Sequence, residues 1–101
     1  MADELELYNE TYARLVELRA QAIRSADLSE LYRTSVLPQS QAAVEAGLSA
    51  YRVGSLEFMS VLESQMTVNR FEIERVRLAA EHQEALAGID ALTGNTPGGD
   101  R

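Results

Sequence analysis

The chain has 101 residues, of which 16 are Asp or Glu and nine are Lys or Arg, so its formal net charge is −7 at pH 7. This charge disfavours the phosphate contacts on which nucleic-acid affinity depends, and we expect no nucleic-acid partner. A chain of this size built from elongated helices cannot enclose a deep catalytic pocket by itself, which argues against an enzyme. The absence of Cys excludes disulfides, thiolate metal sites and cysteine nucleophiles.

The first predicted element is a bent helical arm over residues 4–53. Apolar residues recur in it at steps of three and four, the spacing of one helix face: Leu5, Tyr8, Tyr12, Leu15, Ala22 and Ala26. We expect a kink or a short break between residues 25 and 38, because Pro38 has no N–H to donate to the carbonyl four residues earlier. The arm stops at Gly54, which suits the left-handed position that follows a helix.

A tip at residues 54–55 links this arm to a second helical arm over residues 56–93. Ser55 is expected to cap the second helix, which ends at Gly94. Residues 94–101 are predicted to be a disordered tail. Because the link is so short, the arms fold back antiparallel. The predicted fold is therefore all-α, a long coiled-coil-like helical hairpin without strands, with arms of about 50 to 75 Å at 1.5 Å per residue.

Two neighbouring apolar stripes run along the second arm. The first stripe keeps a seven-residue repeat for about four heptads and consists of Met59, Leu62, Met66, Asn69, Ile73, Val76, Ala80, Gln83 and Ala87. The second stripe lies beside it and consists of Phe58, Val61, Gln65, Val68, Phe71, Arg75, Leu78, His82, Ala85, Ile89 and Leu92. One hairpin partner covers only one seam, so we expect neighbours on two sides and self-association of the isolated chain.

Few residues suggest chemistry. His82 is the only histidine, so a solvated or seam histidine is favoured over a metal ligand. Met59 and Met66 share a stripe with Leu62, which favours core packing over a flexible ligand groove. The sequence contains neither a phosphate-binding glycine loop nor a nucleophile elbow. We predict no catalytic residue, no cofactor and no metal site.

The start of the chain, MADELELYNE, is acidic where a signal peptide needs a basic region followed by an apolar run. No apolar run approaches the roughly 20 residues of a membrane-spanning helix. We therefore expect the chain as written to be soluble, and to be one part of a larger protein if that protein is exported.

The stretch YRVGSLEF between the arms has two interpretations. Any helix-to-helix turn needs a glycine and a capping residue, so the stretch is explained by the turn alone. The second interpretation is a tip that the two arms present to a partner. These residues are compatible with both interpretations.

Short sequence anchors follow one another over residues 31–94. They are Leu37-Pro38-Gln39, Ala50-Tyr51 with Val53-Gly54, Val61-Leu62-Glu63-Ser64-Gln65, and Leu92-Thr93-Gly94. In this order and spacing they resemble the C-terminal end of the outer membrane efflux proteins, the TolC-like outer membrane factors. Residues 4–30 match this family only as generic helix, and Ser60 stands where many members have an acidic residue.

The resemblance implies a periplasmic hairpin of an outer membrane channel that is a trimer in its full-length form. Members of this family dock a periplasmic adaptor protein and reach an inner-membrane pump indirectly, as parts of a tripartite export system. By this resemblance, Glu63 lies near the tunnel entrance, and the adaptor-contacting tip consists of Tyr51, Val53, Gly54, Ser55 and Leu56. The alternative is a free-standing soluble coiled-coil scaffold or adaptor that self-associates through the same stripes.

Overall fold

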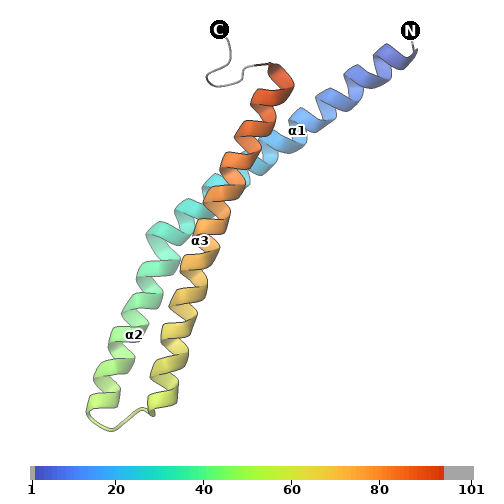
Figure 1. The fold of residues 1–101 in the computed structure, drawn as a ribbon. Helices are drawn as coiled ribbons and strands as arrows, with labels where there is room; N and C mark the ends of the chain where they lie inside the picture. Colours follow the sequence, from blue (N-terminus) through green and yellow to red (C-terminus); the bar gives the residue numbers. More distant parts are fainter. Residues whose placement is uncertain (1, 95–101) are drawn as a thin grey trace. The chain divides into compact units, whose positions relative to one another are not determined.

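The computed structural model describes residues 2–94, which form helices joined by one short turn (Figure 1). Helix α1 (Ala2–Leu31) continues through a five-residue π-helix, η1 (Tyr32–Val36), into α2 (Leu37–Arg52). After the turn, α3 spans Phe58–Thr93. Over this range the chain contains no strand, and the fold is the expected all-α helical hairpin. Within the same residues, no helix combines the length and the hydropathy needed to span a membrane.

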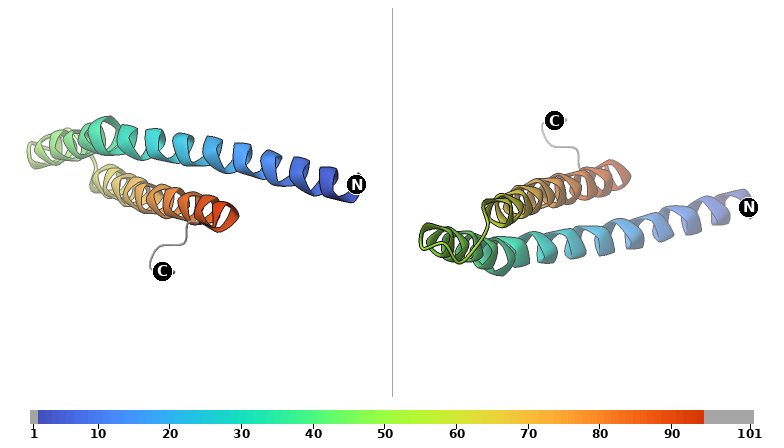
Figure 2. Two further views of the ribbon diagram at one scale, coloured as in Figure 1. Left: turned by 90° about the horizontal axis from the view of Figure 1, so that it is seen from above. Right: turned by 90° about the horizontal axis from the view of Figure 1, so that it is seen from below.

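The helices divide into two compact units. Unit 1 combines the chain up to Asp27 with the chain from Ala79 onward, and unit 2 is Leu28–Leu78. Inside each unit a segment of α3 runs antiparallel to the helix from the first arm. That helix is α1 in unit 1, and it is α2 with η1 in unit 2 (Figures 1 and 2).

Small side chains allow close helix packing in unit 1. Ser25 and Ala85 are both fully buried. The hydroxyl of Ser25 donates to two carbonyl oxygens of the preceding turn, at 2.7 and 3.2 Å, so this buried polar group is satisfied within its own helix. A methyl group on Gly88 would lie 3.0 Å from Cδ1 of Leu18. Glycine at this position therefore leaves room for the leucine side chain of α1.

The segment for which a kink was predicted stays helical and contains the π-helix. Pro38 lies in the first turn of α2 and cannot donate an α-helical hydrogen bond. Instead, the N–H of Leu37 donates to the carbonyl of Tyr32, five residues earlier. Leu37 is buried, and the ring of Tyr32 packs edge-on against Phe71 with 5.8 Å between centroids. The additional residue in this turn keeps both side chains, five positions apart, in the packed seam.

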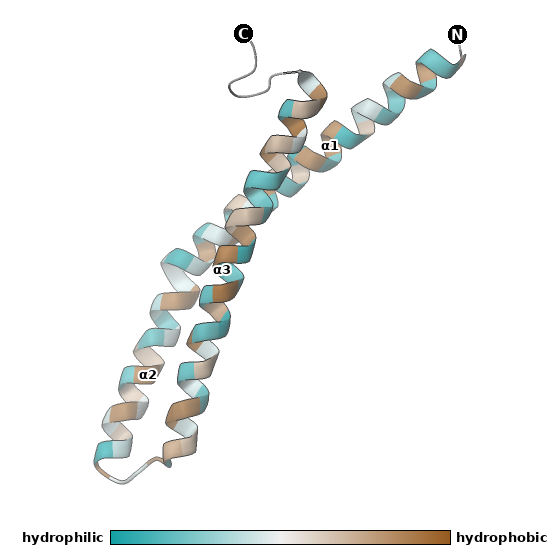
Figure 3. Cartoon of the chain, in the orientation of Figure 1, coloured by the Kyte–Doolittle hydropathy of each residue, from teal (hydrophilic) through white to brown (hydrophobic). Residues whose placement is uncertain are grey.

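The two stripes of α3 differ in burial. In the second stripe Val68, Leu78 and Ala85 are buried, so this stripe forms the seam of the hairpin. Every member of the first stripe is exposed, including Met59 at 58% and Met66 at 50%. Figure 3 shows hydrophobic and hydrophilic residues following one another along α3. The prediction that these two methionines pack in a core is wrong for this chain.

The ends of the helices differ slightly from the predicted arms. The second helix begins at Phe58, whereas the predicted arm begins at residue 56. Gly94 has the expected left-handed conformation after α3, with φ +77°. The rest of the predicted tail, residues 95–101, lies outside the described residues.

Candidate functional site: the hairpin tip

The turn between α2 and α3 is a Schellman motif. Gly54 has φ +80°, a left-handed conformation that costs other L-residues about 1–2 kcal/mol. Its N–H donates to the carbonyl of Tyr51 at 3.0 Å, and the N–H of Ser55 donates to the carbonyl of Ala50 at 2.9 Å. These bonds satisfy two of the last carbonyls of α2 and define the backbone path of the tip.

Ser55 caps the C-terminal end of α2, in the first arm, and not the start of α3. Its hydroxyl donates to the carbonyl oxygen of Ala50 at 3.1 Å, the same oxygen that accepts its backbone N–H. At the start of α3 the carbonyl of Glu57 accepts the first two helical hydrogen bonds, at 3.1 and 3.4 Å. The prediction that Ser55 caps the second helix is therefore wrong, because its hydroxyl is already bound to α2.

Two aromatic rings flank the turn. Tyr51 near the end of α2 and Phe58 at the start of α3 have ring centroids 5.9 Å apart and planes tilted by 58°. Aromatic pairs in such arrangements contribute about 0.5–1.5 kcal/mol beyond their burial. Tyr51 is still 43% exposed and Phe58 57% exposed. The pair therefore links the two helix ends and also presents apolar surface to solvent.

Val53 lies in the turn itself and is the most exposed large apolar residue in the described part of the chain, at 79%. Met59, in the first turn of α3, is 58% exposed. With the aromatic pair, these residues form an exposed surface that we call the apolar tip: Tyr51, Val53, Phe58 and Met59. Exposed aromatic and aliphatic side chains of this kind are typical of the centre of protein-binding surfaces.

Leu56 is turned toward α2. It is half-buried, and its Cδ2 atom would lie 3.4 Å from a methyl group placed on Gly47. The structure thus gathers the five predicted tip residues at one end of unit 2, with Leu56 on the inner side of the turn. Phe58 and Met59 are absent from the predicted tip. For Phe58 the sequence offers a signal, because an aromatic residue lies within four positions of Gly54 on either side, Tyr51 before it and Phe58 after it.

Glu63 lies more than one turn into α3. Its exposed side chain lines a shallow depression of about 370 Å³ together with Met66, Thr67 and Arg70. The guanidinium of Arg70 donates to Oγ1 of Thr67 at 3.2 Å. Glu63 is therefore placed on an open helix surface beside a cation, separate from the turn.

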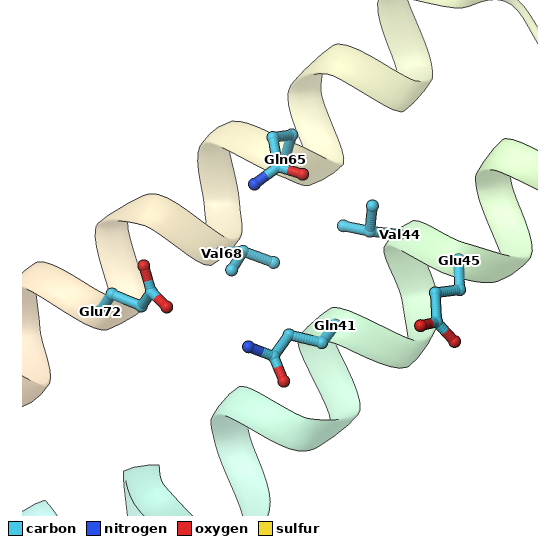
Figure 4. Close-up of a pocket in the computed structure, with 6 residues that line it drawn as sticks. All are labelled: Gln41, Val44, Glu45, Gln65, Val68 and Glu72. Atoms are coloured by element: carbon cyan, nitrogen blue, oxygen red, sulfur yellow. The ribbon is translucent and has the colours of Figure 1, made fainter.

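A second groove opens between α2 and α3 (Figure 4). It has a volume of about 360 Å³, and Val44 and Val68 point into the space between the helices. Around these valines the lining is polar and acidic, with Gln41, Glu45, Gln65 and Glu72. These amides and carboxylates offer hydrogen-bonding groups to a neighbouring chain, and the lining contains no nucleophile with an adjacent base.

His82 is a seam residue of unit 1. Its Nδ1 lies 2.9 Å from the carbonyl oxygen of Ala22 in α1. Because a carbonyl only accepts, Nδ1 carries the proton. Beside it, Arg24 and Glu81 form an ion pair across the two helices at 3.0 Å. In the part of the chain that the structure describes, no group of three or more His, Cys, Asp or Glu side chains is placed to hold a metal ion.

Two glutamates with perturbed pKa values belong to ion pairs within single helical segments. Arg33 donates two hydrogen bonds to Glu30, and these bonds together with its charge lower the pKa of that carboxyl. A hydrogen bond from Arg77 is the main cause that lowers the pKa of Glu74. Both pairs span three residues along the helix and stabilise it locally.

The tip and the first stripe are open apolar surfaces, which suit protein binding better than catalysis. Neither a protein-family model, nor a curated protein, nor a solved structure matches the chain.

Proposed function

We propose that this chain is a periplasmic helical hairpin of a trimeric, TolC-like outer membrane efflux channel, and that its tip docks a periplasmic adaptor protein. The observation that carries the proposal is the apolar tip, because a hydrogen-bonded turn exposes Val53 at its apex. A turn held in one conformation binds a partner at a lower entropic cost than a flexible loop. The resemblance of the sequence anchors supplies the identity of the partner.

Support for an oligomer comes from the first stripe. Met66, Ile73 and Val76 expose 50%, 68% and 58% of their surface, although the second stripe of the same helix is covered. In a tunnel of helices each hairpin packs between two neighbours, so a neighbouring protomer would cover the first stripe. In this proposal the chain has a binding role, without a reaction or a cofactor, and contact with an inner-membrane pump is indirect.

The second candidate function is a free-standing coiled-coil scaffold. It is favoured by the same exposed stripe, since two copies paired along α3 would bury it without any channel. The two candidates differ in what they require of the apolar tip. A scaffold that pairs along α3 does not require an exposed apolar tip, whereas an adaptor-docking hairpin does.

Fractionation of the source cells separates the two candidates. If the chain is part of a channel, an antibody raised against it will detect an outer membrane protein several times larger than 11.1 kDa. A soluble protein of 11.1 kDa would establish the scaffold and contradict the channel.

A substitution at the apex tests the docking role directly. We expect Val53→Asp to abolish co-purification of the adaptor with the channel, because it places a charge at the centre of the apolar tip. The matched control is Ala42→Asp, which adds the same charge at an exposed position of α2. Adaptor recovery that is equal for both variants and the wild type would contradict the assignment of the tip.

A further inference from the structure

The first three turns of α1 extend beyond α3. Leu18 packs against Gly88, and α3 ends only five residues later, at Thr93. Because the two helices are antiparallel, the residues of α1 up to about residue 12 have no described turn of α3 opposite them. Both views in Figure 2 show α1 extending past the end of α3. We call residues 2–12 the α1 extension.

Large apolar side chains are exposed on two sides of the α1 extension. Leu7 precedes Leu18 by eleven residues, three helical turns, so it continues the face that α3 covers further along α1. Leu5 and Tyr12 lie one heptad apart on a second face. Leu7 is 65% exposed, Leu5 61% and Tyr12 62%. Figure 3 shows hydrophobic and hydrophilic residues alternating along these turns.

The same turns carry a concentrated negative charge. Asp3, Glu4, Glu6 and Glu10 lie within them, and no Lys or Arg precedes Arg14. Two copies of this chain paired through the extension would bring eight carboxylates together, which opposes a homodimer here. An anionic membrane surface would be repelled for the same reason.

We propose that the α1 extension is a docking surface for a basic amphipathic helix of another protein. Leucine or isoleucine side chains of that helix would cover Leu5 and Tyr12, and its flanking Lys and Arg side chains would face Glu6 and Glu10. Apolar contact supplies the affinity, and opposite charge selects the partner and speeds its association. The surface belongs to unit 1, whereas the apolar tip belongs to unit 2, so the proposal does not depend on the efflux function.

A synthetic peptide tests the surface with the full chain. The probe is a fluorescein-labelled 18-residue amphipathic helix of Leu and Lys, and its binding is followed by fluorescence anisotropy at low salt. We expect Leu5→Ser/Tyr12→Ser to weaken binding at least about tenfold, because two apolar contacts are lost. Glu6→Gln/Glu10→Gln should weaken it by about fivefold, and added salt should remove this difference.

The matched control is Glu57→Gln/Glu63→Gln, which removes the same charge from exposed positions of unit 2. It should leave the affinity within about twofold of the wild type, since screening limits the effect of distant charges. Equal weakening by both glutamine pairs would mean that the peptide senses only net charge and would overturn the proposal. Equal binding of a Leu/Glu peptide would also overturn it. The third contrary result is a dimer in sedimentation equilibrium that Leu5→Ser/Tyr12→Ser dissociates, because a second copy would then occupy the surface.

Discussion

Replacing Gly54 with alanine measures the backbone energy of the tip. Gly54 has φ +80°, and apart from its two chain neighbours no residue would have an atom within 4 Å of a methyl group there, so the substitution creates no clash with the rest of the chain. The left-handed conformation costs alanine about 1–2 kcal/mol. The reduced freedom of the unfolded chain offsets about 0.4–1 kcal/mol of this cost. We expect Gly54→Ala to lower the free energy of unfolding by about 1 kcal/mol.

Urea unfolding followed by circular dichroism at one fixed protein concentration measures this change. Gly54→Asn should lower the free energy of unfolding by about half as much as Gly54→Ala, because asparagine tolerates the left-handed region better than alanine. Gly47→Ala is the matched control, since this glycine lies inside α2 and its added methyl group would make an ordinary contact at 3.4 Å. The control should raise stability by up to about 1 kcal/mol. A Gly54→Ala variant as stable as the wild type would show that the left-handed conformation of residue 54 does not constrain the tip.

Three further predictions concern packing and charge outside the tip. His82→Ala should lower the free energy of unfolding by about 0.5–1.5 kcal/mol, because the hydrogen bond to α1 is lost. Gly88→Leu should lower it by about 1–3 kcal/mol, because the larger side chain overpacks against Leu18. Urea unfolding measures both changes. The lowered pKa values of Glu30 and Glu74 mean that their ion pairs stabilise the fold at neutral pH, and that this contribution is lost as the pH falls below the ordinary glutamate value of about 4.3. The variant Glu30→Gln/Glu74→Gln should therefore show a weaker dependence of the free energy of unfolding on pH between about 5 and 3. An unchanged dependence would contradict the stabilising role of the two ion pairs.

Local features of the fold could be predicted because they depend on the backbone of a few adjacent residues. Gly54 and Gly94 both have the left-handed conformation expected after a helix. The turn between the arms follows from the first of these glycines. By contrast, the prediction that Ser55 caps the second helix fails, because the Schellman turn brings its hydroxyl back to the carbonyl of Ala50 in α2.

The π-helix and the true composition of the tip could not be predicted in this way. Pro38 indicates a disturbance of the helix, but either a kink or a π-turn accommodates a proline. The packing of Tyr32 against Phe71 favours the π-turn, since it keeps the first arm in contact with α3. Phe58 has the spacing of a seam residue, yet it is exposed because it lies at the end of the hairpin beside Tyr51.

The sequence by itself determined that this chain is a helical hairpin with one turn at Gly54 and two apolar stripes on its second helix. Helical periodicity and glycine conformation are short-range properties, so these features can be recognised without a structure. Only the tertiary structure decided which stripe is covered. Val68 and Ile73 differ little in hydropathy, but the first is 5% exposed and the second 68%. The difference arises because one antiparallel partner can cover only one side of a helix, and the rotation of α3 about its axis is set by contacts along the entire seam.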